Sequence, residues 1–144
     1  MTSTVQKQNS RSRAIARGFL IGVELFVAVG AVYGGVGLIA DNAIGMLPEW
    51  LDGTPFSNWT LPGIFLLLIV ATPMFLAAVA ELRRARWAYA ASLVAGAAMV
   101  GWIVVQLIVI GRYFFLQPIM FACGAAVIVL AWAVHRGERV LPVR

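Results

Sequence analysis

The chain has 144 residues, of which 62% are hydrophobic and 12% are charged, and its mean hydropathy is +0.91. A water-soluble domain carries about 25% charged residues, so this chain has too little polar surface to enclose a soluble globule. The net charge of +5 would suit a nucleic-acid-binding protein, but the basic residues flank apolar runs, which is the membrane pattern. The composition predicts a protein that is embedded in a lipid bilayer and binds no nucleic acid.

Four apolar segments have the length of about 20 residues that a helix needs to cross the hydrocarbon core. They cover about residues 18–40, 61–80, 87–110 and 114–134. The first segment is too long for the apolar region of a cleavable signal peptide, so we count it as a span. The sequence therefore predicts an all-α fold, an integral membrane four-helix bundle over residues 17–135.

Polar segments lie at both ends of this bundle. Residues 1–16 are rich in Ser, Thr, Gln and basic side chains, which predicts a cytoplasmic tail that is disordered or lies on anionic headgroups. Residues 136–144 form a second basic tail. Ten of the eleven basic residues lie in these two tails, at Arg17, or in the link after the second span, and Arg112 lies alone on the other side. The positive-inside rule then places both termini in the cytoplasm of a multi-pass protein of the cell membrane.

Glu24 is an ionisable residue inside the first span, where its burial is costly and indicates a function by default. Arg17, Ala28 and Ala31 lie on the same helical face, which predicts that this face turns toward the bundle. Glu24 is expected to be neutral, paired with Arg17, or hydrogen-bonded, with three candidate hydroxyl partners: Thr72, Ser92 and Tyr89. A packing role, proton- or cation-coupled binding and a contact with a partner subunit all remain open for this residue.

The first span also carries small residues spaced four apart, of which Gly30 and Gly34 are one pair. Such pairs let helix backbones approach closely in lipid, so we expect them at a helix–helix or subunit interface. Pro73 removes one backbone hydrogen bond from the second span and predicts a kink near Ile69.

The outer loop, residues 41–60, is too apolar to be freely solvated. We expect it to fold as a cap over the outer mouth of the bundle, and a ligand-binding lid is the alternative. Pro48 should open a short helical turn, and Thr60 should cap the second span. Trp50 and Trp59 are expected to anchor the outer membrane interface.

Three polar residues lie in or beside the last two spans. Gln106 lies in hydrocarbon and predicts an interhelical hydrogen bond, because its amide needs partners there. His135 at the cytoplasmic end is expected to snorkel to the interface. Arg112 is expected to staple the outer loops by pairing with an outer acid, for which the candidates are Asp41, Glu49 and Asp52.

Several site classes are excluded by residue counts. A single His cannot provide bis-His haem ligation, and one His with one Cys makes a transition-metal cluster improbable. The chain contains no C-x-x-C pair, phosphate-cradling glycine motif or Ser/His/Asp set at membrane depth. We therefore expect a non-enzymatic protein without a cofactor or metal.

Short sequence pieces resemble a group of small uncharacterised four-helix membrane proteins of high-GC Gram-positive bacteria. They span about residues 18–134 and comprise Pro48-Glu49-Trp50-Leu51, Gly53-Thr54-Pro55-Phe56, Leu61-Pro62-Gly63, Gly101-Trp102-Ile103-Val104-Val105-Gln106 and Leu116-Gln117-Pro118. This resemblance implies the fold and no activity. Small multidrug resistance exporters are similar in having four helices and a Glu in the first, which only Glu24 matches here; their shorter outer loop and third-helix Gly and Tyr signature are absent.

The function expected from the sequence is that of an accessory or assembly subunit, or a small oligomer, of a membrane complex. The alternative is a small proton- or cation-coupled transporter that uses Glu24. The two differ in their partners, because an accessory subunit contacts other membrane subunits whereas a transporter binds its solute by itself.

Overall fold

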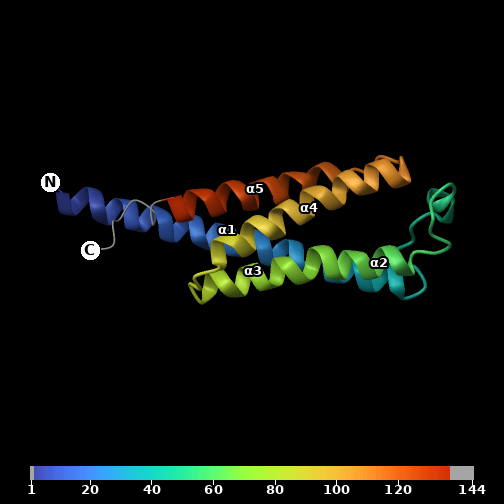
Figure 1. The fold of residues 1–144 in the computed structure, drawn as a ribbon, viewed down its shortest axis with the longest axis horizontal. Helices are drawn as coiled ribbons and strands as arrows, with labels where there is room; N and C mark the ends of the chain where they lie inside the picture. Colours follow the sequence, from blue (N-terminus) through green and yellow to red (C-terminus); the bar gives the residue numbers. More distant parts are fainter. Residues whose placement is uncertain (1, 137–144) are drawn as a thin grey trace.

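The computed structural model describes residues 2–136, and every regular element among them is a helix (Figure 1). The elements in chain order are α1 (Thr2–Ile39), the 3-10 helix η1 (Pro48–Leu51), α2 (Thr60–Leu66), the π-helical segment η2 (Leu67–Ala71), α3 (Thr72–Leu82), α4 (Ala88–Ile110) and α5 (Leu116–Arg136). Because α2, η2 and α3 follow one another without a break, they form one membrane-length helix. The described residues thus contain four helices that are long and apolar enough to cross a membrane, which confirms the all-helical prediction.

The predicted spans agree with these helices to within two residues, except at the first one. The fourth helix starts two residues later than predicted, because α4 ends at Gly111 in a left-handed conformation (φ 64°) and an irregular link follows. Of the two alternatives for the N-terminal tail, disorder is wrong for the described residues, since α1 begins at Thr2 and continues without interruption into the first span. The tail has no helix-breaking Gly or Pro before Gly18, so the helix can extend into it.

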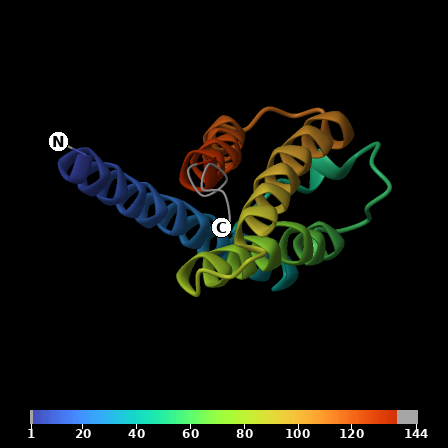
Figure 2. The same ribbon diagram turned by 60° about the vertical axis from the view of Figure 1, so that its left-hand side comes forward.

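The four long helices pack in a ring rather than around one central helix. α1 contacts α2, η2 and α3 on one side and α5 on the other, while α4 contacts α3 and α5. The start of α1, the α3–α4 turn and the end of α5 share one end of the molecule, and the long loop and the α4–α5 link share the other (Figures 1 and 2). The basic link, the described part of the N-terminal tail and Arg136 therefore lie at the same end, in agreement with the charge pattern. Apolar side chains from all four helices fill the centre, among them Leu20, Val27, Met74, Met99 and Val127.

Close helix contacts run through glycines, but not through the predicted pair. Gly30 is exposed, and a Cβ added to it would meet nothing within 4 Å; at Gly34 it would meet a Leu66 methyl at 3.3 Å. The tight contact of α1 is at Gly35, which lies against Gly63 of α2. A Cβ added to Gly63 would lie 2.7 Å from the Gly35 carbonyl oxygen. The prediction of a close backbone contact through Gly30 is therefore wrong within the monomer, because Gly30 faces away from the bundle.

Pro73 interrupts the second span where the sequence predicts, and the interruption is a π-turn. Pro73 has no N–H to offer the preceding turn, and η2 lies immediately before it. The backbone N–H of Thr72 donates to the carbonyl of Leu67, and its hydroxyl donates to the same oxygen at 2.9 Å. The carbonyl oxygen of Leu67 therefore keeps hydrogen-bond donors although the turn contains one extra residue.

The outer loop packs against the helix ends, as expected for a folded cap. Leu51 and Trp59 are buried with Leu38 of α1 in a second apolar cluster. The side chain of Trp50 is half-buried and meets the ring of Phe114 edge-on, with centroids 6.1 Å apart. The loop therefore reaches from the α1–α2 end to the α4–α5 link. The predicted turn after Leu47 is also present, as η1 with Pro48 in its first positions.

Two predictions about the end of this loop need correction. Trp59 is only 6% exposed, so it packs in the loop's own core and is not a surface anchor for the interface. Thr60 is the first residue of α2 and supplies no side-chain cap; instead the Asn58 side-chain oxygen accepts a hydrogen bond from the Thr60 N–H at 3.1 Å. Asn reaches a following N–H readily in such turns, which leaves the threonine hydroxyl with no capping task.

Labelling of introduced cysteines tests how these helices cross the membrane. In a Cys123→Ala background, Ser57→Cys in the exposed outer loop should react with an impermeant thiol reagent in intact cells. Ser3→Cys, and Gly137→Cys just beyond the described residues, should react only after the membrane is permeabilised, because the positive-inside rule predicts that the basic ends face the cytoplasm. Labelling of Gly137→Cys from outside would mean an odd number of spans.

Candidate functional site

Glu24 is fully buried in the bundle, as its helical face predicts. Its side chain is 0% exposed, and Ala28 and Ala31 on the same face are buried with it. Glu24 Oε1 lies 2.6 Å from the hydroxyl oxygen of Ser92 on α4. Ser92 is thus the partner among the three hydroxyl candidates. Within residues 2–136 no group hydrogen-bonds Glu24 Oε2.

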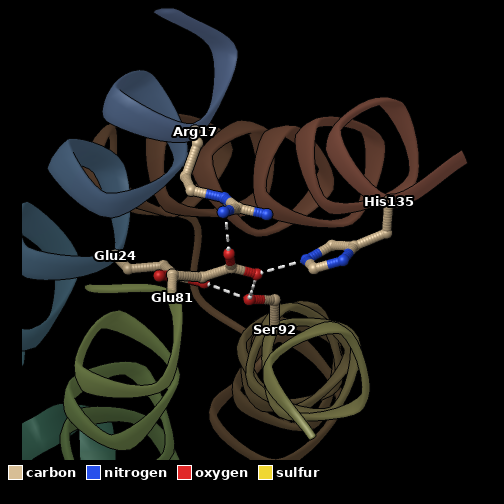
Figure 3. A network of polar contacts seen from close by, with 5 residues as sticks. All are labelled: Arg17, Glu24, Glu81, Ser92 and His135. Carbon is tan, nitrogen blue, oxygen red and sulfur yellow. Dashed lines mark hydrogen bonds and ion pairs between the residues drawn. The ribbon is translucent and has the colours of Figure 1, made fainter. Parts of the chain in front are cut away.

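Glu81, in the last turn of α3, is the centre of this polar cluster (Figure 3). It is 1% exposed, and its Oε1 lies 2.7 Å from His135 Nε2 and 3.3 Å from Ser92 Oγ. Its Oε2 lies 3.3 Å from Arg17 Nε. The angles of this last contact are not those of a hydrogen bond, so Arg17 and Glu81 form an ion pair by distance alone. Pairing with Arg17 was one alternative for Glu24, and the structure shows Arg17 in an ion pair with Glu81.

Every long helix contributes a side chain to the cluster, and the spacing of residues on α1 and the tight α3–α4 turn explain this. Arg17 and Glu24 are seven residues apart, which is two turns, so they share one face of α1. The α3–α4 turn is tight: Arg84 adopts φ 51°, and the Ala85 N–H donates to the Ala80 carbonyl at 2.9 Å. This turn brings Ser92 back beside the end of α3. The last turn of α5 places His135 opposite both.

His135 is the clearest departure from the sequence prediction. It is 8% exposed, so it does not snorkel to the interface. Its ring nitrogen contacts Glu81, and its ring lies 5.2 Å from that of Tyr89, with the planes tilted by 47°. The side chain turns inward because a buried carboxylate is a better partner than solvent that it would share with Arg136. Tyr89 was a candidate partner of Glu24 and is found beside His135.

Glu81 was not singled out from the sequence, although a signal for it exists. It falls one residue after the predicted second span and next to three arginines, so it looks like part of a solvated loop. However, Met74, Ala77, Ala78 and Glu81 repeat every three or four residues, and all four are buried. Extending the apolar face of the helix by one turn would have placed Glu81 inside.

Two other predicted residues lie outside this cluster. Gln106 is half-buried along an apolar groove with Phe56 and Phe65, and its side chain hydrogen-bonds no other residue that the structure describes. The predicted interhelical bond is absent because apolar side chains line its surroundings. Arg112 is exposed, and between residues 2 and 136 its side chain forms no ion pair with the outer acids, whose own exposure leaves little to gain. The Arg112 carbonyl instead accepts a hydrogen bond from Gln117 Nε2 at 3.3 Å.

The charges of the cluster suit the binding of one proton. Among the described residues of the cluster, the one guanidinium of Arg17 stands beside two carboxylates, so ionised Glu24 and Glu81 with neutral His135 would carry a net charge of −1. A buried, uncompensated charge is expensive, and a proton on either Glu24 or His135 removes it. Within the described residues, no group of three or more His, Cys, Asp or Glu side chains could hold a metal ion. The chemistry that this arrangement can perform is proton uptake and release.

Comparison with family models, with curated proteins and with solved structures found no match to this chain.

Proposed function

We propose that this is a non-enzymatic, small proton-coupled transporter of the cell membrane, in which Glu24 exchanges a proton during the cycle. One observation carries the proposal: a single buried cluster takes an ionisable or hydroxyl side chain from each of the four membrane-length helices (Figure 3). Ionisable groups at membrane depth are costly, and they typically mark ion or proton pathways.

The position of the cluster supports coupling of protonation to helix packing. Ser92 of α4 and His135 of α5 both contact Glu81 of α3, and Glu24 of α1 contacts the same serine. A change of one charge at this meeting point alters the interaction of every helix with its neighbours. A protein with two packings shifts between them when a ligand favours one, and here the ligand is a proton.

Uptake into vesicles tests this proposal, with tetraphenylphosphonium as a lipophilic cationic probe. Vesicles with an acidic interior that contain the purified protein should accumulate the probe as protons leave. Glu24→Gln keeps the shape and hydrogen bonding but cannot ionise, so it should lower the rate by about tenfold or more. Glu49→Gln, which changes an exposed acid in η1, should transport normally. Coupled uptake that survives Glu24→Gln would remove Glu24 from the mechanism.

A role as an accessory or assembly subunit, or as a small oligomer, is the second candidate. It is favoured by the exposed small residues of α1: Cβ atoms added to Gly18, Gly22 and Gly30 would meet nothing within 4 Å. Gly18 and Gly22 also line a groove of about 570 Å³ with Phe19, Phe26 and Cys123. Close approach of another helix is what such a surface allows in lipid. Purification in mild detergent with mass spectrometry should then recover a partner, and Gly22→Leu should release it.

A further inference from the structure

We propose that Glu24, Ser92, Glu81 and His135 form a proton relay that opens only toward the basic end of the bundle, with the proton resting on Glu24. The inference deepens the proposed function and rests on it only for the claim that the relayed proton drives transport. The relay itself stands on the contacts of the cluster.

The starting point is the single hydroxyl proton of Ser92. Its oxygen lies 2.6 Å from Glu24 Oε1 and 3.3 Å from Glu81 Oε1, yet a serine can donate only one hydrogen bond. If both carboxyls were ionised, one of the two contacts would place lone pairs against lone pairs. Both contacts are satisfied when Ser92 donates to one carboxylate and accepts a hydrogen bond from the other, protonated, carboxyl group.

The surroundings of the two acids decide which one carries the proton. Glu81 faces Arg17 at one oxygen and His135 at the other, so its negative charge is compensated. Among residues 2–136, the one hydrogen-bond partner of Glu24 is Ser92, and no group there hydrogen-bonds its Oε2. An unpartnered carboxylate oxygen is much more costly to bury than an unpartnered carbonyl oxygen. The structure thus assigns the proton to Glu24 Oε1, which donates to Ser92 Oγ, which in turn donates to Glu81 Oε1.

Release follows the same contacts in order. The Glu24 O–H bond breaks as its proton moves to Ser92 Oγ, and the original Ser92 proton moves to Glu81, so the serine hydroxyl is regenerated. Glu81 then passes a proton to Nε2 of His135, which can accept it only when the neutral ring carries its own proton on Nδ1, and the ring becomes an imidazolium. Glu24 ends as a carboxylate and no atom is lost. Among the residues that the structure describes, the polar groups that face this path are Arg17 from α1, Glu81 from α3, Tyr89 and Ser92 from α4, and His135 from α5.

The burial of the cluster gives the relay its direction. The side chains of Arg17 and His135 are 15% and 9% exposed, whereas Glu24 is 0% exposed. His135 is followed by Arg136 at the basic end of the bundle. On the other side of Glu24 the bundle is filled by apolar side chains from all four helices, namely Val27, Ala31, Val70, Met74, Met99 and Val127. No described polar group continues the path there, so the proton enters and leaves at the basic end in this conformation.

Infrared spectroscopy of the detergent-solubilised protein tests where the proton rests. A carbonyl band of a protonated, buried carboxyl should be present in the wild type at neutral pH. It should be lost in Glu24→Gln and kept in Glu49→Gln, which removes an exposed acid. Dicyclohexylcarbodiimide, which reacts with protonated carboxyls in apolar surroundings, should modify Glu24 and leave Glu81 unmodified. Persistence of the band in Glu24→Gln, or modification at Glu81 alone, would overturn the assignment.

Deuterium exchange of the same band tests the relay. Transfer to D₂O should shift the band, and Ser92→Ala should slow this shift by about tenfold. His135→Phe should slow it similarly, and this variant decides the matter if Ser92→Ala does not fold. Ser57→Ala in the exposed loop is the matched control. Exchange at the wild-type rate in both cluster variants would overturn the relay.

Failure of probe uptake with normal infrared results would remove only the transport proposal. Loss of the expected infrared and exchange results with uptake retained would remove only the relay.

Discussion

Replacing Glu81 by methionine is expected to lower the free energy of unfolding by about 3 kcal/mol, near the lower end of the range for breaking a buried ion pair. The lower end applies because the Arg17 side chain keeps 15% of its surface exposed and can turn partly toward water. The loss arises because the variant removes the contacts of Glu81 with Arg17 and His135, of which the first is an ion pair of opposite charges. Reversible unfolding in a mixed detergent measures the change.

A double-mutant cycle distinguishes the effect of losing the Arg17–Glu81 ion pair from the effect of losing side-chain packing at Glu81. Arg17→Met combined with Glu81→Met removes both charges and leaves apolar side chains of similar length. Because apolar replacement of a whole buried pair is often neutral or stabilising, the double variant should lose less stability than Glu81→Met alone. Glu49→Met changes an exposed acid and should stay within about 0.5 kcal/mol of the wild type. A double variant as unstable as the sum of the single changes would contradict the ion pair.

The second large effect is expected at the contact of α4 with α5. A Cβ added to Gly96 would lie 2.9 Å from the Gly124 carbonyl oxygen and 2.7 Å from Ile128 Cγ1. The isoleucine can rotate, but the backbone oxygen moves only if the two helices separate. Overpacking in Gly96→Ala should therefore cost about 1–3 kcal/mol. The gain in helix propensity, about 1 kcal/mol for Gly to Ala, offsets part of this cost, so a net loss of up to about 2 kcal/mol is expected.

Gly101→Ala on the same helix is the matched control for this prediction. A Cβ there would meet nothing within 4 Å, so only the gain in helix propensity remains. Gly101→Ala should be neutral or slightly stabilising, while Gly96→Ala unfolds at a lower detergent concentration. Equal stability of the two variants would mean that α4 and α5 do not approach each other at Gly96 as the structure shows.

Only part of the site could be predicted from the sequence, because its residues differ in how clearly a local pattern marks them as buried. Glu24 is conspicuous because it is the one acid within a predicted span, and its face could be identified from the neighbouring alanines. Ser92 could be suggested only as one of three candidate hydroxyls. Glu81 and His135 lie at span ends beside arginines, where a local pattern does not distinguish an inward side chain from a solvated one. The contact between them joins residues 54 positions apart.

The sequence by itself determined the number of membrane-length helices among the described residues and their limits to within two residues at α2–α3, α4 and α5, because apolar length is a local property. It also indicated that Arg17, the α3–α4 link and Arg136 share one end, since successive helices alternate in direction (Figure 1). Tertiary structure alone decided which glycines touch another backbone and which acid Arg17 meets. Both depend on the rotation of each helix about its axis, which is fixed by packing among all four helices. The same packing joins Glu24, Glu81, Ser92 and His135 into one cluster.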